Sequence, residues 1–195
     1  MRLFSLILLF IFCSCSSKGE LDNYFYPEEE QPQEIKNDLA NSLYGEGNIN
    51  LEKSNFNLAL FFFKRSLELE ENTIIYNSLG ITEKYRENID KSIEYHKKGI
   101  DLDTTYPQNY INIAISYIYK EDYLNSELIL KKLLDNTTSE YWKAYTNLYL
   151  AAIYTKTQDC RLVEKHLLKA QELEKDEVLG AFYRKTKNIF ESNCK

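Results

Sequence analysis

The chain has 195 residues, of which 44% are hydrophobic and 28% are charged, so it is richer in apolar residues than disordered proteins are. Its net charge of -6 leaves no excess of Lys and Arg to neutralise phosphates, which excludes sequence-independent binding to nucleic acid. Three Pro and six Gly are too few for the turn-rich connections of a β-sandwich or barrel, so the composition favours an all-α fold.

The first residues have the pattern of a secretory signal peptide. Arg2 supplies a positive charge, residues 3–12 are apolar except for Ser5, and a Cys-Ser-Cys-Ser-Ser run follows. Ten apolar residues would span about 15 Å as a helix, which is half of a roughly 30 Å hydrocarbon core. We therefore do not expect a retained transmembrane helix at this end of the chain.

Residues 12–15, Phe-Cys-Ser-Cys, resemble a bacterial lipobox, with Phe12 where the pattern usually has Leu. The resemblance implies that residues 1–14 are a lipoprotein signal peptide and that Cys15 is diacylated and becomes the mature N-terminus. Ser16 stands where an inner-membrane retention signal would have Asp, so we expect a lipid-anchored protein of the bacterial cell envelope, delivered to the outer membrane. An ordinary secretory signal with incidental cysteines is the alternative.

Residues 15–38 are expected to form the lipid anchor and a flexible acidic tether. Residues 16–33 hold two of the three prolines, a run of glutamates at 28–30 and no helical period. Tyr24, Phe25 and Tyr26 are unusual in a tether. They either contact the first helix locally or fold back onto the binding surface of the body and compete with a partner.

The body, residues 39–175, contains an internal repeat. Four segments align on a small residue in the middle of a first helix, with spacings of 33, 34 and 37: Gly47, Gly80, Ala114 and Ala151. Two further columns of mostly small residues lie in a second helix: Ala59, Ser92, Ser126 and Val163, then Ser66, Gly99, Leu133 and Ala170. Two columns of mostly large residues pack beside them: Phe56, Ile89, Tyr123 and Cys160, then Phe63, His96, Leu130 and Leu167.

This pattern resembles the tetratricopeptide repeat, a helix-turn-helix of 34 residues, although the closing Pro of that repeat is absent from all four units. Leu79-Gly80 and Ile113-Ala114 stand at its Leu-Gly position, with Tyr117 and Tyr154 at its Tyr position. The resemblance implies a right-handed superhelical solenoid of about four such hairpins. Residues 176–195 are expected to form a C-terminal capping helix, because their apolar residues fall on one side.

In tetratricopeptide proteins the first helix of each pair lines a concave groove. The resemblance assigns this concave groove to Asn77, Ile81, Tyr85, Ile111, Ile115, Ile118, Tyr119, Tyr145 and Leu148. No basic cluster accompanies these residues, so we expect a protein or peptide segment with apolar anchors as the partner. The alternative is that a tight superhelix, or the tether itself, covers this apolar strip.

No motif points to catalysis, to a cofactor or to a metal. Neither His96 nor His166 has a carboxylate or thiol at metal-ligand spacing, and His96 occupies a packing column. HExxH, GxSxG, CxxC and a complete GxGxxG do not occur in the sequence. We therefore expect a protein-binding adaptor and no enzyme, with an assembly chaperone resembling the pilotins as the alternative.

Two cysteines, Cys160 and Cys194, would remain in the body of the mature protein. If the capping helix runs back antiparallel, Cys194 falls within one turn of Cys160, which would permit a disulfide in an oxidising compartment. The alternative is that Cys160 is a free buried thiol that fills its packing column.

Overall fold

A computed structural model describes residues 34–177 and 179–194, and all regular structure in these ranges is helical, which confirms the expected all-α fold. The helices are α1 (Asp38–Glu52), α2 (Phe56–Leu69), α3 (Thr73–Tyr85), α4 (Ile89–Leu102), α5 (Pro107–Tyr119), α6 (Tyr123–Asn136), α7 (Glu140–Thr157), α8 (Cys160–Lys169), the 3-10 helix η1 (Gln171–Lys175) and α9 (Gly180–Cys194). Cys15 and the aromatic residues 24–26 lie outside the described residues. None of the described helices combines the length and the apolar character needed to cross a membrane.

The two helices of each hairpin from α1 to α8 are joined by the same short turn. One residue of each turn has the left-handed conformation: Ser54, Glu87, Glu121 and Gln158, with φ between 58° and 64°. The next residue donates its backbone N–H to a carbonyl five residues earlier, as Asn88 does to Glu83 at 2.9 Å. These left-handed residues are separated by 33, 34 and 37 positions, the same spacings as the small residues that align the sequence repeat. Each sequence repeat therefore contains one turn of this kind.

Polar residues mark where helices begin. The side chains of Asn37, Asn72, Asp122 and Asp159 each accept a hydrogen bond from a backbone N–H in the first turn of the following helix. Pro107 occupies the first turn of α5, where a missing N–H costs nothing. Local sequence therefore sets the helix boundaries.

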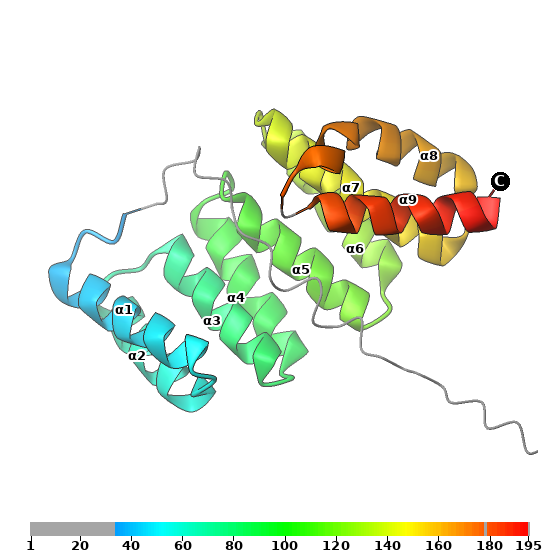
Figure 1. Ribbon diagram of the computed structural model, residues 1–195. Coiled ribbons are helices and arrows are strands. Elements are labelled where there is room, and N and C mark those ends of the chain that lie inside the picture. Colours follow the sequence, from blue (N-terminus) through cyan, green and yellow to red (C-terminus); the bar gives the residue numbers. More distant parts are fainter. Residues whose placement is uncertain (1–33, 178, 195) are drawn as a thin grey trace, which may run out of the picture.

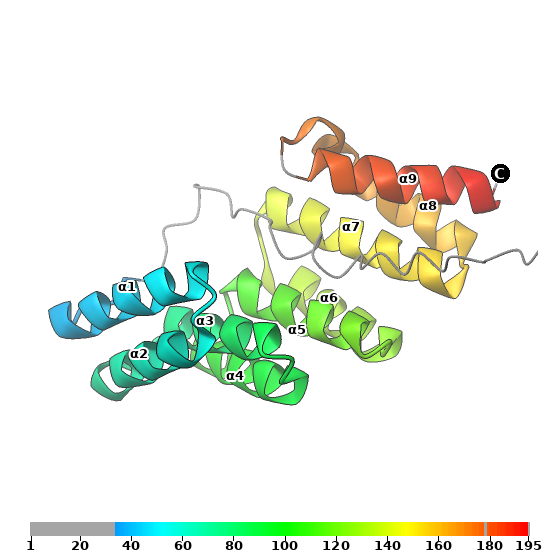
Figure 2. The ribbon, with the colours of Figure 1, turned by 60° about the horizontal axis from the view of Figure 1, so that its bottom comes forward.

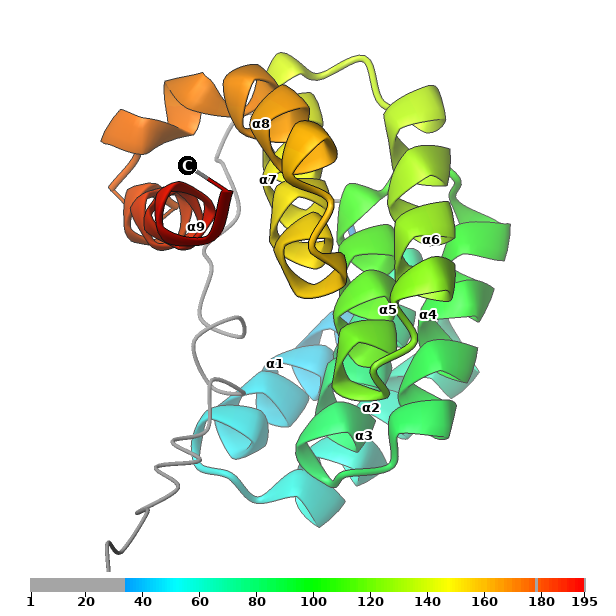
Figure 3. The same ribbon diagram turned by 90° about the vertical axis from the view of Figure 1, so that its right-hand side faces the viewer.

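The hairpins stack side by side along the chain, from α1 and α2 to α7 and α8 (Figure 1). Helices α1, α3, α5 and α7 form an inner layer in which each contacts the next, and α9 follows against α7 (Figure 2). Helices α2, α4, α6 and α8 form the outer layer, and in the described chain no two of these outer helices contact each other. The outer helix of each hairpin also packs against the inner helix of the next. Because the inner helices contact one another and the outer helices do not, the stack curves, and the inner layer lies on its concave side (Figure 3).

The small residues that align the repeat make room for large side chains of the partner helix. The ring of Phe63 on α2 lies against Gly47 on α1, and the imidazole of His96 on α4 lies against Gly80 on α3. A Cβ at position 80 would stand 2.5 Å from His96 Nε2, closer than real Cβ contacts. In the other two hairpins the large position is leucine, and alanine stands at the small position.

A chain of buried polar contacts joins the second and third hairpins. His96 Nδ1 lies 3.0 Å from Asn109 Oδ1, and Asn109 Nδ2 donates to Thr73 Oγ1 at 2.9 Å. Thr73 Oγ1 in turn donates to the carbonyl oxygen of Gly99 at 2.9 Å. All three side chains are fully buried, so these bonds fix how the hairpins meet, since an unpaired buried polar group would cost about 1–3 kcal/mol.

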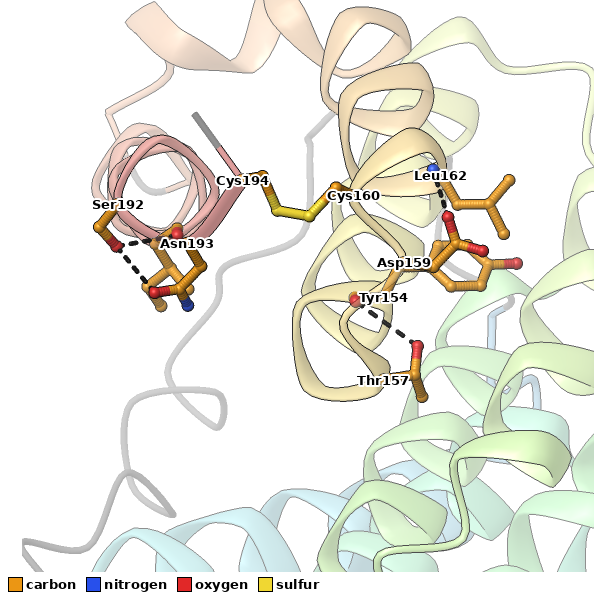
Figure 4. The surroundings of a disulfide bond; sticks show 9 residues. Tyr154, Thr157, Asp159, Cys160, Leu162, Ser192, Asn193 and Cys194 are labelled. Atoms are coloured by element: carbon orange, nitrogen blue, oxygen red, sulfur yellow. Dashed lines mark hydrogen bonds between the residues drawn. A yellow bond between two sulfur atoms is a disulfide. The ribbon is translucent and has the colours of Figure 1, made fainter.

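Helix α9 closes the C-terminal end of the stack. Cys160, the first residue of α8, and Cys194, the last residue of α9, are joined by a disulfide with their Cα atoms 5.6 Å apart (Figure 4). At the other end of α9, Arg184 Nη1 donates to the carbonyl of Glu174 at 2.8 Å, and Lys187 Nζ lies 3.0 Å from its carboxylate. The C-terminal end of α9 is thus attached to α8, and Arg184 and Lys187 attach the helix to η1.

The segment before α9 is less regular than the sequence suggested. Residues 176–195 were expected to form one helix, but α9 begins at Gly180, after the 3-10 helix over residues 171–175. Asp176 has extended backbone, and its carboxylate accepts a hydrogen bond from the N–H of Leu179 at 2.7 Å. This local bond starts the helix a few residues later than the expected boundary.

Candidate functional site

The residues predicted for the concave groove all lie on α3, α5 and α7 of the inner layer. Their exposure differs widely. Ile111 and Ile115 are 3% exposed, and Asn77, Tyr145 and Leu148 are equally well buried. Ile81, Ile118 and Tyr119 are half-buried, and Tyr85 is 39% exposed.

The contacts of α5 show which of its sides faces the concavity. Asn109, Asn112 and Ser116 point to the second hairpin, since their side chains meet polar atoms of α3 and α4. Tyr110 and Ala114 point to α6: the hydroxyl of Tyr110 lies 3.4 Å from an amide on α6, and the carbonyl of Ala114 accepts a bond from α6. The turn of 100° per residue leaves one remaining side, which α5 shares between its contact with α7 and the concavity. This side carries Gln108, Ile111, Ile115, Ile118 and Tyr119.

Gln108 belongs to this site, although the sequence did not single it out. Its side chain is 8% exposed, and its Oε1 has no hydrogen-bond partner among the described residues. Gln108 lies one turn before Ile111, on the side of α5 that faces the concavity. Helical spacing from Ile111 and Ile115 is the sequence signal that could have found it.

Asn77 is engaged by a neighbour that sequence reasoning also missed. Asn112 Nδ2 donates to Asn77 Oδ1 at 2.9 Å, so α5 occupies the Asn77 acceptor that could otherwise face a ligand. Asn112 follows Asn77 by 35 residues, close to the repeat period, and this spacing is the signal that could have paired them. The bond ties two inner helices together beneath the concave groove.

Tyr85 lies at the edge of the concave groove. Its ring stacks on that of Phe56 on α2, with the centroids 5.7 Å apart and an interplanar angle of 9°. Lys84 Nζ lies 5.6 Å from the same ring. Tyr85 therefore marks the boundary between the first hairpin and the inner face of α3.

On α7 the inner face is a row of aromatic rings. Tyr145 stacks on Tyr149 with centroids 5.2 Å apart, and Tyr149 meets Phe182 of α9 edge to face at the same distance. Trp142 and Tyr141 extend the row toward the start of α7. Offset and edge-to-face pairs of this kind stabilise by about 0.5–1.5 kcal/mol each beyond their burial. Because Trp142, Tyr145 and Tyr149 are buried, the row fixes α7 within the core.

Both histidines are buried, and each contacts the side chain of an asparagine. Burial lowers the pKa of His96 to about 3, and burial together with Lys165 and Lys169 lowers that of His166 to about 4, so both are neutral at pH 7. His166 Nδ1 lies 2.8 Å from Asn147 Oδ1 of the same hairpin, whereas His96 contacts Asn109 of the next hairpin. Within residues 34–177 and 179–194, no group of three or more His, Cys, Asp or Glu could hold a metal ion.

No protein-family model matches the chain, and no curated protein matches its sequence. Solved structures resemble it at low identity. The MamA protein aligns with a TM-score of 0.60 and 18% identity, over 80% of this chain and 86% of MamA. TTC0263, a thermophilic TPR protein of Thermus thermophilus, aligns with a TM-score of 0.61 and 17% identity, over 76% of this chain and 81% of its own. The chain has the fold of a tetratricopeptide-repeat solenoid.

A third solved structure of this fold, PilF of Pseudomonas aeruginosa, aligns with a TM-score of 0.58 and 14% identity. The alignment covers 76% of this chain and 66% of PilF. At these identities the likeness concerns the path of the chain alone. It supports the tetratricopeptide-like architecture, while the individual residues of the concave groove stay predictions.

Proposed function

We propose that this chain is a lipid-anchored interaction adaptor that holds a partner protein at the bacterial cell envelope, through the concave groove. The observation that carries the proposal is the set of accessible apolar side chains on the inner face of α3 and α5, namely Ile81, Tyr85, Ile118 and Tyr119. This face is apolar and tyrosine-rich and includes a buried amide acceptor on Gln108. Anchoring through Cys15, with delivery to an outer membrane, is the part of the proposal that rests on the lipobox resemblance.

The chemistry of the groove defines the kind of partner. Half-buried aliphatic and aromatic side chains, such as Ile81, Ile118 and Tyr119, suit an extended or helical segment with apolar anchors. A partner held in this way contributes most of its affinity through a few anchors, and truncating one often costs about 2 kcal/mol or more. Neither a cofactor nor nucleic acid is part of the proposed function.

The test is partner capture from membranes by chemical crosslinking to the full chain. Ile118→Asp should reduce the yield of a specific crosslinked partner at least tenfold, because it places a charge among the anchors. The matched control is Leu128→Asp on the outer helix α6, where Leu128 is 64% exposed; it should leave the yield unchanged. Both variants must keep the helical circular dichroism of the wild type, and equal capture by both would refute the groove as the binding surface.

An assembly chaperone, which binds a membrane subunit transiently while it inserts, is the second candidate. The inner face that would serve an adaptor would serve a chaperone equally well. A stable complex with one partner in the wild-type cell supports the adaptor. Mislocalised outer-membrane subunits in a deletion strain, without such a complex, would support the chaperone.

A further inference from the structure

The two ends of the hairpin stack are closed differently. At the C-terminal end, α9 packs against α7 and α8 and covers the last hairpin (Figure 1). At the N-terminal end, α1 and α2 contact each other and α3, and no other described helix contacts either of them. A stack of repeats needs a cap at each end, because every hairpin presents an apolar surface to its neighbours. In the described chain, the first hairpin is the end that lacks a capping helix.

Ile49 shows what the missing neighbour leaves exposed. Its equivalents in the later hairpins, one repeat apart, are Thr82, Ser116 and Ile153, and these are at most 2% exposed. Ser116 Oγ lies 3.4 Å from Ser92 Oγ on α4, so this position of an inner helix faces the preceding hairpin. Ile49 has no preceding hairpin among the described residues, and it is 44% exposed. The first hairpin thus carries a stacking surface that the described helices leave uncovered.

On α2, apolar side chains gather on the side that points away from the stack. Phe56 stacks on Tyr85 of α3, which identifies the side of α2 that faces the second hairpin. At 100° per residue, the opposite side of α2 carries Leu58, Arg65 and Leu69. Both leucines are exposed, Leu58 more than half.

The outward side of α1 continues this surface. Ser78 Oγ of α3 donates to the hydroxyl of Tyr44 at 3.2 Å, which identifies the side of α1 that faces α3. At 100° per residue, the opposite side carries Leu39 and Glu46, both exposed. Concentrations of exposed apolar side chains mark interaction surfaces. The end face is defined here as the outward residues of both helices: Leu39, Glu46, Ile49, Leu58, Arg65 and Leu69.

The charges of the end face are complementary under a two-fold axis. Glu46 adjoins Gly47, against which the ring of Phe63 on α2 lies, so Glu46 and Arg65 stand at similar heights along the hairpin. A two-fold axis parallel to the helices lays α1 of each copy over α2 of the other. It brings the Glu46 carboxylate of each copy near the Arg65 guanidinium of the other, and the leucines of the two end faces against each other. Arg65 pairs with Glu68 within one copy, but both are more than half exposed, and such surface pairs contribute little.

The size of the end face predicts a reversible dimer. Helix α1 has 15 residues and is about 22 Å long, and two helices side by side are about 20 Å wide. The end face therefore covers about 440 Å² in projection, less than the roughly 800 Å² that each partner buries in a standard complex. Small interfaces of this kind belong to transient complexes, so we expect dissociation in the micromolar range.

We propose that two copies of this chain pair through the end face, with α1 of each copy over α2 of the other. Each copy then serves as the missing neighbour of the other and caps its open end. The end face shares no residue with the concave groove, so the dimer presents two grooves. A partner with two binding segments would bind such a dimer more tightly than it binds one copy.

The first experiment is sedimentation equilibrium of the full chain in a density-matched detergent. The wild type should change from monomer to dimer over the micromolar range, and Leu58→Asp should weaken the dimer at least tenfold, because it places a charge in the interface. The matched control is Leu124→Asp on α6, at an 82% exposed leucine outside the end face, and it should leave the dimer unchanged. A monomeric wild type, or equal effects of the two substitutions, would overturn the proposal.

The second experiment exchanges the charges of the end face. Arg65→Glu should weaken the dimer at least threefold, because it brings a like charge to Glu46 of the other copy. Adding Glu46→Arg should restore the wild-type affinity, since both members of each pair are then reversed. Both positions are exposed, so neither change alters the hydrophobic core. A double variant that fails to recover would overturn the arrangement of α1 over α2.

The dimer and the adaptor function fail separately. If Ile118→Asp keeps the dimer and no partner is captured from membranes, the dimer stands and the adaptor function is wrong. If a partner is captured through Ile118 by a chain that stays monomeric, the adaptor function stands and the dimer is wrong. A monomeric chain whose binding to phospholipid vesicles falls on Leu58→Asp would show that the end face meets a lipid surface instead of a second copy.

Discussion

Gly80 on α3 and the imidazole of His96 on α4 are in direct contact, with no room between them for a methyl group. A Cβ at position 80 would come within 2.5 Å of His96 Cε1 and Nε2. His96 is fully buried and is held on its other side by Asn109, so its ring has no free direction in which to move. The small residue that aligns the repeat is therefore required by its partner helix.

Gly80→Ala is expected to destabilise the protein. Alanine in a helix interior normally stabilises by about 0.5–1 kcal/mol relative to glycine, but overpacking against the fixed ring costs about 1–3 kcal/mol. Urea denaturation should show a net loss of stability. The control is Gly45→Ala, where a Cβ would meet nothing within 4 Å, and which should gain stability. A Gly80→Ala variant as stable as the wild type would contradict this packing.

Acidification should destabilise the fold through His96. Burial lowers the pKa of His96 to about 3, below the unfolded value near 6.5, so the unfolded state binds the proton first. Stability is fully present above pH 6.5 and falls by about 1.4 kcal/mol per pH unit as the pH drops toward 3. Urea denaturation at pH 7, 6 and 5 should give a shallower loss for His96→Leu, and identical slopes would contradict the prediction.

Glu121→Gly is expected to stabilise the turn between α5 and α6. Glu121 has a left-handed backbone, with φ 58°, which costs a residue with a side chain about 1–2 kcal/mol. Glycine removes that cost and adds some unfolded-state entropy, so we expect a gain of about 0.5–1 kcal/mol. Glu164→Gly, an exposed position inside α8, is the control and should lose about 1 kcal/mol. In thermal melts, a higher melting temperature for Glu121→Gly and a lower one for Glu164→Gly would support the left-handed conformation of Glu121.

The disulfide between Cys160 and Cys194 should be present in protein from an oxidising compartment. Its sequence separation of 34 makes the closed loop worth about 3–4 kcal/mol on the loop-entropy model. Cys194→Ser should therefore lower the melting temperature and release the end of α9 to faster hydrogen exchange. Mass spectrometry after alkylation without reductant checks the bond directly, and two alkylated thiols would show that it does not form.

Cys15 is predicted to carry the lipid. Metabolic labelling with an alkyne fatty acid should tag the wild-type chain and the Cys13→Ala variant alike. Cys15→Ala should lose the label and be released from membranes, because the acyl chains on Cys15 are predicted to supply the membrane attachment. Undiminished labelling of Cys15→Ala would contradict the lipobox assignment.

Part of the fold could be predicted because it depends on local order in the sequence. Apolar residues at helical spacing determine helices, and a small residue every 33 to 37 positions places one turn after each inner helix. The proximity of Cys160 and Cys194 could also be predicted from the sequence. In two antiparallel helices, residues at equal distances before and after the connecting turn lie side by side. These features need only neighbours in sequence or the adjacent helix.

The tertiary structure alone decided what each groove residue can offer. Asn77 and Ile111 occupy equivalent places in the repeat, yet Asn77 accepts a hydrogen bond from Asn112, whereas Ile111 is buried in the hydrophobic core. Gln108 keeps an unsatisfied acceptor because no side chain of a neighbouring hairpin reaches it in the described chain. Such differences depend on how far each hairpin rotates against the next, which is the sum of many side-chain contacts about one repeat apart. Periodicity specifies that the hairpins stack, whereas packing sets the curvature and thereby the accessible atoms.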